Sequence, residues 1–256
     1  DVATTGCGGS HGRVGRGERV GSCGGHQREV RDNGTSSGGV SIVDWNELLT
    51  ALRREGLLVS ATAEGVDLAG LGIDTRTIGP GQLYCAVRGT TSDGHGFAAE
   101  AVAKGAVAVM GERTMGAGVP EILVTDGRRA ASAAARAWYR DPAAALTLIG
   151  ITGTNGKTTT TGLVRHLFNA KGTAGSIGTL GAFDGAGQPV PSTAGSLTTP
   201  GPVDLHATFA ELRNRGVTHV AMETSSHSLD QGRLDGLTFA AGVFTNLTHE
   251  HLDYHR

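Results

Sequence analysis

The chain has 256 residues and a formal net charge of −2, so it lacks the basic field that holds a nucleic acid or an anionic membrane. Its three cysteines, Cys7, Cys23 and Cys85, stand far apart without metal-ligand spacing, which is typical of a reducing cytoplasm. No apolar run reaches the roughly 20 residues that cross a bilayer. We therefore expect a cytoplasmic, monomeric chain that neither binds nucleic acid nor enters a membrane.

The first segment, residues 1–40, consists mainly of Gly, Ser, Arg and Thr, with hardly any large apolar residue. Such a composition cannot bury enough surface to offset the entropy lost on folding. We predict a disordered extension here. Its composition is equally compatible with a tag, a natural extension or residues outside the true reading frame.

Residues 41–145 are predicted to form a small α/β domain. Asp44 can cap a helix that carries Trp45, Leu48, Leu49 and Leu52 on one face and ends near Gly56. The alternation of later elements indicates strands packed against helices. These elements are an extended run at 82–87, a helix at 97–104, strands at 106–110 and 122–125, and an alanine-rich helix at 128–140.

Residues 146–256 are predicted to form a second domain, an incomplete P-loop-type ATPase domain with a parallel sheet. Asp141-Pro142 ends the preceding helix, and residues 146–151 form an apolar run short enough for a buried strand. A glycine-rich loop, a helix to about residue 170 and strands at 174–177, 217–222 and 239–244 follow. Alternating strands and helices predict ligand binding at the carboxyl ends of the strands.

The loop Gly153-Thr154-Asn155-Gly156-Lys157-Thr158 has the strand-loop-helix setting of a phosphate site. Glycines let backbone N–H groups converge on phosphate, and the helix start adds partial positive charge. Lys157 would reach the β/γ-phosphates of ATP, and Thr158 would bind Mg²⁺. The general pattern for such loops is G-x-x-x-x-G-K-[ST], and this chain has Ile151 where the pattern has its first glycine. The alternative is therefore a glycine turn that merely precedes a helix.

Thr152 to Thr160 resembles the ATP loop of the Mur ligase family, and further segments occur in the family's order. They are residues 74–76 with 79–81, 89–94, 197–200, 223–229 and 245–255. The resemblance covers about residues 72–256 and is strongest to the tripeptide-synthetase branch, although neighbouring Mur ligases and folylpolyglutamate synthetase have similar loops. It implies an ATP-dependent amide-bond ligase that joins a diamino acid to UDP-N-acetylmuramoyl-L-alanyl-D-glutamate, through an acyl phosphate, in peptidoglycan precursor synthesis.

The resemblance also implies roles for individual residues. ATP binding would fall to Gly153, Thr154, Asn155, Gly156, Lys157, Thr158 and Thr159, and Mg²⁺ binding to Thr158, Glu223 and His251. Lys157, Glu223 and His251 would be the catalytic set. The uridine diphosphate end of the substrate would contact Thr75, Thr90, Thr91 and Ser92. The muramoyl-peptide part would contact Thr198, Thr199, Ser225, Gln231 and Arg233, with Arg233 as the partner of the glutamate carboxylate.

Several of these roles have a simpler alternative. A lone histidine such as His251 is usually structural. Glu223 could be an ordinary strand-end carboxylate, and Arg233 a solvated loop charge. The segment from Thr90 to Ser92 could be a polar turn. Glu250 stands where the family's pattern has aspartate, and its longer arm changes the local geometry.

Two parts of the family pattern do not occur in this sequence. A carbamylated lysine is expected beyond His251, and a C-terminal domain is expected to choose between meso-diaminopimelate and L-lysine. We favour diaminopimelate because the Ala/Gly/Arg-rich composition is typical of high-GC bacteria. We expect the isolated chain to lack ligase turnover in a coupled ADP-release assay. The alternative is a catalytically inactive fragment that binds nucleotide or UDP-muramoyl peptide.

Overall fold

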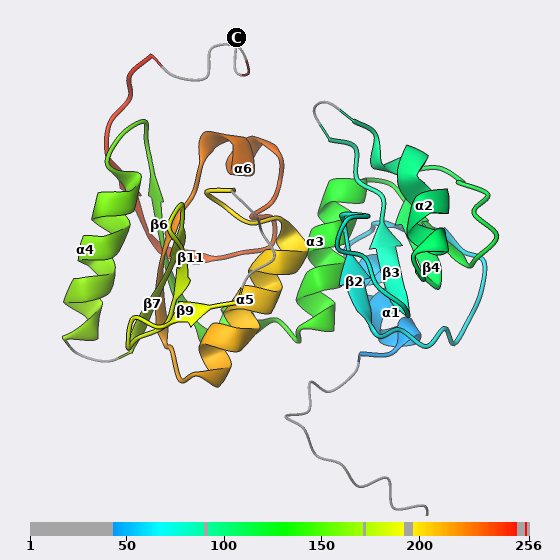
Figure 1. The fold of residues 1–256 in the computed structure, drawn as a ribbon, viewed down its shortest axis with the longest axis horizontal. Coiled ribbons are helices and arrows are strands. Elements are labelled where there is room, and N and C mark those ends of the chain that lie inside the picture. The colour runs from blue at the N-terminus through cyan, green and yellow to red at the C-terminus, as the bar shows by residue number, and fades with distance from the viewer. Residues whose placement is uncertain (1–42, 90–91, 171–172, 192–196, 250–253, 255–256) are drawn as a thin grey trace, which may run out of the picture. The chain divides into compact units, whose positions relative to one another are not determined.

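The computed structural model describes residues 43–89, 92–170, 173–191, 197–249 and 254. The prediction of disorder for residues 1–40 lies outside these ranges. So do the predicted roles of Thr90, Thr91 and His251 and the substitution at Glu250. The described residues form two sheets with helices packed on them (Figure 1), which confirms the predicted α/β class.

The first sheet has the strand order β1-β5-β4-β3-β2. Strands β2 to β5 are parallel along this order, and β1 pairs antiparallel with β5. The strands are β1 (Leu58–Ala61), β2 (Gly70–Gly72), β3 (Gln82–Cys85), β4 (Ala108–Gly111) and β5 (Glu121–Val124). The helical segments are α1 (Trp45–Arg54), η1 (Gly94–Phe97), α2 (Ala98–Ala103) and α3 (Gly127–Trp138).

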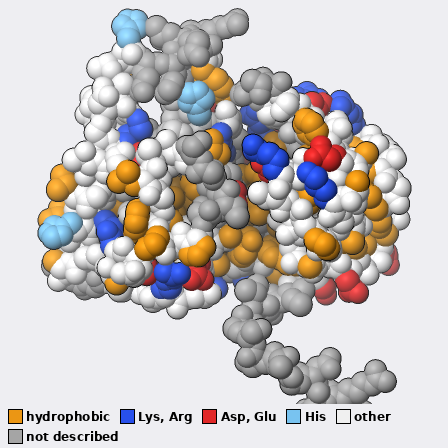
Figure 2. Space-filling view, viewed as in Figure 1, with side chains coloured by type: hydrophobic (Ala, Val, Ile, Leu, Met, Phe, Trp, Pro, Cys, Tyr) orange, Lys and Arg blue, Asp and Glu red, His pale blue; other side chains and the backbone are white. Residues whose placement is uncertain are grey.

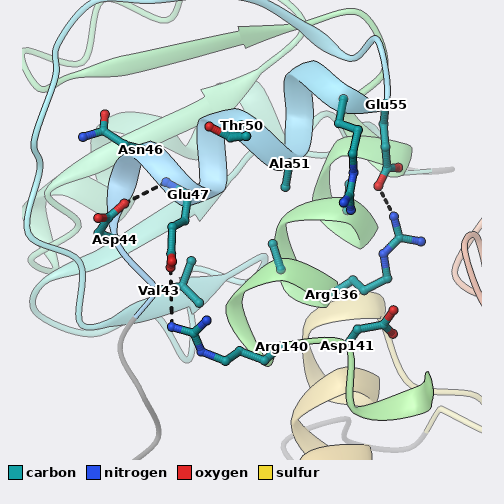
Figure 3. A pocket seen from close by; sticks show the side chains of 13 residues that line it. Val43, Asp44, Asn46, Glu47, Thr50, Ala51, Glu55, Arg136, Arg140 and Asp141 are labelled. Carbon is teal, nitrogen blue, oxygen red and sulfur yellow. Dashed lines mark hydrogen bonds and ion pairs between the residues drawn. The ribbon is translucent and has the colours of Figure 1, made fainter. Parts of the chain in front are cut away.

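Helix α1 forms as the sequence predicts. The Asp44 carboxylate accepts a hydrogen bond from the Glu47 amide at 2.7 Å and so caps the helix start. The predicted apolar face of α1 is buried in the core with α3. Figure 3 shows Glu47 of α1 and Glu55, which follows α1, paired with Arg140 and Arg136 respectively beside a cavity of about 560 Å³. Ion pairs at such a partly exposed surface contribute little to stability, so the buried apolar face of α1 holds the two helices together.

The second sheet has the order β11-β6-β10-β7-β8-β9. The first four of these strands are parallel, whereas β8 and β9 add an antiparallel edge. The strands are β6 (Thr147–Thr152), β7 (Ala174–Gly178), β8 (Gly181–Phe183), β9 (Pro189–Val190), β10 (His219–Glu223) and β11 (Phe239–Phe244). The helical segments are η2 (Pro142–Ala145), α4 (Lys157–Asn169), α5 (Pro202–Asn214) and α6 (Ser226–Asp230).

Helices α4 and α5 cover opposite faces of the second sheet (Figure 1). Successive residues of a strand point to opposite faces, so Val220 and Met222 pack in the α5 core while Ala221 packs with Val164 of α4. Both faces are covered at β6 and β10, which explains why these strands are apolar runs, whereas β11 at the sheet edge is mostly exposed.

Parallel register brings the strand ends together. Glu223 of β10 pairs with Ile151 of β6, and Phe244 of β11 pairs with Thr152. Met222 pairs with Ile177 of β7. The segments that follow these strands therefore emerge along one edge of the sheet, where the sequence predicts the ligand site.

The sequence did not predict helix α5, the short strands β1, β2, β8 and β9, the five-residue helix α6 or the 3₁₀ segments η1 and η2. Helix α5 buries residues around most of its circumference, including Val203, Leu205, Thr208 and Phe209, so it shows no clear apolar stripe. Strands β1 and β2 are only four and three residues long, and β2 contains two glycines.

On the face drawn in Figure 2, Lys and Arg side chains lie interspersed with acidic and hydrophobic ones. Within the described ranges, no helix is both long enough and apolar enough to cross a membrane. The expected absence of nucleic-acid binding and the expected monomeric state remain predictions from the sequence.

His206 on α5 should make the fold sensitive to acid. Burial, followed by the charge of Arg136, lowers the pKa of His206 to about 4, and its Nδ1 is buried without a partner in the described structure. In the unfolded chain this histidine binds a proton near pH 6.5, whereas in the folded chain it does so only near pH 4. The free energy of unfolding is therefore highest above pH 6.5 and decreases as the pH is lowered from about 6.5 to 4. The largest loss is about 3 kcal/mol.

We expect His206→Leu to flatten the decline of Tm between pH 7 and pH 5, measured by calorimetry. The exposed His166 on α4 provides the matched control, and His166→Leu should keep the wild-type slope. Equal slopes for His206→Leu and the wild type would contradict the assignment.

Candidate functional site

The glycine-rich loop connects β6 to α4 and depends on the backbone of Gly153. Its φ is 124°, and a Cβ at this position would collide with the Thr245 hydroxyl and lie 2.8 Å from the Asn246 carbonyl oxygen. Gly156, with φ 82°, precedes α4 as its N-cap. Only glycine fits the first of these positions, because both the conformation and the space exclude a side chain.

The segment after β11 holds the loop from the other side. The Asn246 side chain accepts a hydrogen bond from the Asn155 amide at 3.0 Å and donates one to the Asn155 carbonyl oxygen at 3.0 Å. The Thr245 hydroxyl donates to the same carbonyl oxygen at 2.7 Å. Asn155 is therefore fixed at both its N–H and its C=O group. This role of Thr245 could not be predicted, because the two residues lie 90 positions apart.

Lys157 begins α4 and lies folded against the loop that precedes it. Its ammonium group donates to the carbonyl oxygens of Gly153 at 2.7 Å and Thr154 at 2.8 Å. These contacts place a positive charge beside the loop amides and the N-terminus of α4, a combination that binds phosphate.

Glu223 is the last residue of β10 and is only 1% exposed. One carboxylate oxygen accepts from the Thr179 amide at 3.0 Å, and the other accepts from the Thr179 hydroxyl at 3.1 Å. Gly178 makes room for this carboxylate, since a Cβ there would collide with Glu223 Oε1. The sequence did not indicate Thr179.

The residues predicted for the acceptor substrate form a hydrogen-bonded group. The Thr199 hydroxyl donates to the Glu223 carbonyl oxygen at 2.9 Å and accepts from the Ser225 amide at 3.1 Å. Gln231 Oε1 accepts from Arg233 at Nε, 3.0 Å, and at Nη2, 2.5 Å. Arg233 Nη1 donates to the Thr199 carbonyl oxygen at 2.9 Å, so Arg233 is held by two partners.

One cavity of about 500 Å³ joins the phosphate loop, Glu223 and the acceptor group. Its lining includes ten of the predicted residues, namely Thr154, Asn155, Gly156, Lys157, Thr158, Thr198, Thr199, Glu223, Ser225 and Arg233. Thr179, Leu197 and His227 complete the lining. Thus the structure places residues from four separate segments around one space.

Other predicted residues lie outside this lining. Gly153 packs against Thr245 and Asn246. Thr159 is exposed on α4, and Gln231 is hydrogen-bonded to Arg233, which lines the cavity. Thr75 is buried, with its carbonyl oxygen accepting from Lys104 at 2.8 Å. Ser92 is exposed, and its carbonyl oxygen accepts from the Gly89 amide at 2.8 Å. Their substrate contacts remain predictions.

A neighbouring cavity of about 190 Å³ is lined by three arginines, Arg88, Arg128 and Arg233. Arg128 donates twice to the Arg88 carbonyl oxygen, at 3.1 and 3.0 Å. Burial lowers the pKa of Arg233, and the nearby charge of Arg128 also lowers it. Guanidinium groups favour anions, and the rest of the lining is largely apolar, with Ile73, Val87, Leu197 and Pro202. The sequence analysis did not single out Arg88 or Arg128.

Among the described residues, no three Asp, Glu, His or Cys side chains gather as a metal cluster. The cavity nevertheless offers the Glu223 carboxylate and the Thr158 hydroxyl, both hard oxygen donors. Mg²⁺ prefers such donors and usually completes its coordination with water and substrate phosphate. The residues present therefore fit Mg²⁺.

A strand, a glycine loop, and a helix that begins with Lys-Thr define a phosphate-binding domain of the nucleotide-binding class. Two family models match the chain: Mur ligase family, catalytic domain, over residues 67–139, and Mur ligase middle domain, over residues 151–256. The chain belongs to the Mur ligase family.

Among curated relatives, the UDP-N-acetylmuramoyl-L-alanyl-D-glutamate--2,6-diaminopimelate ligase of Geobacillus thermodenitrificans is 45% identical over 190 residues, which cover 74% of this chain and 38% of the relative. The enzyme of the same name from Agrobacterium fabrum is 46% identical over 192 residues, with the same coverage. A solved structure of a ligase of this name has a TM-score of 0.64 at 26% identity, covering 84% of this chain and 42% of that one. The chain thus spans about two fifths of the length of these relatives.

Proposed function

We propose that the chain is the nucleotide- and acceptor-binding part of an ATP-dependent ligase that adds a diamino acid to UDP-N-acetylmuramoyl-L-alanyl-D-glutamate. The observation that carries this proposal is the single cavity lined by the phosphate loop, Glu223 and the acceptor group. Activation of a carboxylate as an acyl phosphate requires the phosphoryl donor and the acceptor side by side. The names of the curated relatives support diaminopimelate as the added amino acid, ahead of L-lysine.

The phosphate loop would hold the nucleotide by position and charge. Loop amides and the α4 N-terminus would bind phosphate oxygens, and Lys157 would exchange its contacts with the carbonyl oxygens of Gly153 and Thr154 for contacts with the β/γ-phosphates. Thr158 and Glu223 would hold Mg²⁺, which neutralises developing charge on the transferred group. His251 remains a proposed further ligand.

Arg233 would orient the acceptor carboxylate in this cavity. Its Nε and Nη2 are held by Gln231 and its Nη1 by the Thr199 carbonyl oxygen, so a carboxylate would approach a guanidinium whose plane is already fixed. Preorganisation of this kind reduces the entropy lost on binding. The three-arginine cavity beside it would favour the anionic, UDP-linked part of the substrate.

The alternative, a fragment that binds these ligands without chemistry, requires the same cavity. The comparisons support the muramoyl-peptide branch over a folylpolyglutamate synthetase, because the curated relatives cited above bear the diaminopimelate-ligase name. A reaction that consumes ATP and a UDP-linked precursor belongs in the cytoplasm, where we place it.

Isothermal titration of the purified chain tests the proposal. We expect ATP–Mg²⁺ and UDP-N-acetylmuramoyl-L-alanyl-D-glutamate each to bind with one-to-one stoichiometry, and each to bind in the presence of the other. UDP-N-acetylglucosamine, which lacks the peptide carboxylates, is the matched control and should bind more weakly. No binding of either ligand, or mutual exclusion of the two, would contradict a shared ligase site.

A further inference from the structure

The carboxylate of Glu223 is held by one residue from a neighbouring strand. Thr179 donates to Oε1 through its amide and to Oε2 through its hydroxyl, at 3.0 and 3.1 Å. Both oxygens are thus fixed, and each keeps a lone pair for a further partner. Two donors on one carboxylate remove the side chain's freedom to rotate about its terminal bond.

The fold explains why Thr179 can do this. Gly178 and Gly181 pair across the β7–β8 hairpin, which leaves Thr179 and Leu180 as its two-residue loop. Because β7 runs parallel to β10 with Ile177 beside Met222, this loop lies next to the end of β10. The Thr179 amide is outside the strand ladder and is available to Glu223.

The hydrogen-bond donors in this group can be assigned from chemistry. The Thr179 hydroxyl donates its single hydrogen to Glu223 Oε2. The Thr198 hydroxyl lies 3.2 Å from Thr179 Oγ1 and must therefore act as the donor between them. A chain of hydrogen bonds then runs from Thr198, on the acceptor side, through Thr179 to Glu223.

We propose that Thr179 is the positioning residue that aims the Glu223 carboxylate at the nucleotide-bound metal ion, an inference that rests on the proposed function. Thr179 is itself exposed, and its side chain contributes little to the core. Thr179 lines the same cavity as Lys157 and Thr158. The hydroxyl acts through Glu223 and does not bind the nucleotide.

The test compares ATP affinity with Mg²⁺ and with EDTA, because only the metal-dependent part of the affinity should depend on Thr179. Thr179→Val removes the hydroxyl but keeps the shape and the backbone amide, whereas Thr179→Ser keeps the hydroxyl. Thr50→Val, on the exposed surface of α1, provides the matched control. Isothermal titration of the whole chain gives two dissociation constants for each variant. Their ratio, the dissociation constant in EDTA divided by the one with Mg²⁺, measures how much the metal strengthens ATP binding.

We expect Thr179→Val to reduce this ratio by roughly tenfold or more, as for the loss of a hydrogen bond to a charged group, while the affinity in EDTA stays unchanged. Thr179→Ser and Thr50→Val should keep the wild-type ratio. A wild-type ratio in Thr179→Val, or an equal loss with and without metal, would overturn the inference and leave the proposed function standing. Failure of the wild-type chain to bind ATP would overturn both.

Discussion

Lys157→Ala should remove most of the thermal stabilisation that ATP–Mg²⁺ gives to this chain. At about 100 times its dissociation constant, a ligand stabilises the folded state by about 2.7 kcal/mol. Losing hydrogen bonds from an ammonium group weakens binding by roughly 10- to 100-fold. A 100-fold loss would leave about 0.4 kcal/mol of stabilisation at the same ATP concentration. Differential scanning fluorimetry with and without ATP–Mg²⁺ measures both values.

The control is Lys104→Ala at the C-terminal end of α2, where Lys104 pairs with Glu100 at 2.7 Å. This variant removes the same charge from a place outside the cavity and should keep the full ATP-induced shift. Equal shifts in Lys157→Ala and the wild type would show that the loop is only a turn before α4, the simpler alternative considered above.

Gly153→Ala should disrupt both the loop and the stability of the second sheet. At φ 124° alanine is strained, and its Cβ would collide with the Thr245 hydroxyl and with Asn246 backbone atoms. Backbone strain of this kind costs about 1–3 kcal/mol, before the collision is counted. We expect a loss of about 2 kcal/mol or more in urea unfolding, together with loss of ATP binding.

Gly162→Ala is the matched control for this substitution. Gly162 lies on the exposed side of α4, and a Cβ there would have no heavy atom within 4 Å. Alanine is the better helix former, so this variant should gain roughly 0.5–1 kcal/mol and keep its affinity for ATP. A stable Gly153→Ala variant with normal ATP affinity would contradict the proposed loop geometry.

Short-range patterns were enough to predict much of this fold. Asp44 and the apolar face after it define α1, and short apolar runs define the parallel strands, because these signals lie within a few residues of each other. Helix α5 was missed because it is buried on most sides. The antiparallel pair β8 and β9 departs from the expected parallel sheet, because these short strands fold back as hairpins at the sheet edge.

The candidate site depends more on long-range contacts. The loop could be recognised from the order of its residues, but its support by Thr245 and Asn246 comes from segments about 90 positions away. Thr179 meets Glu223 across 44 positions and carries no local signal. Which residues become neighbours at the strand ends depends on the order and register of the parallel strands, and a single sequence does not specify that order.

A crystal structure of the chain with a non-hydrolysable ATP analogue and Mn²⁺ would test the central claim most directly. We predict an anomalous Mn²⁺ peak bound by the Thr158 hydroxyl and the Glu223 carboxylate, with the Lys157 ammonium on the β/γ-phosphates and the nucleotide in the cavity of about 500 Å³. A nucleotide bound elsewhere, or a metal ion without Glu223 among its ligands, would contradict the account.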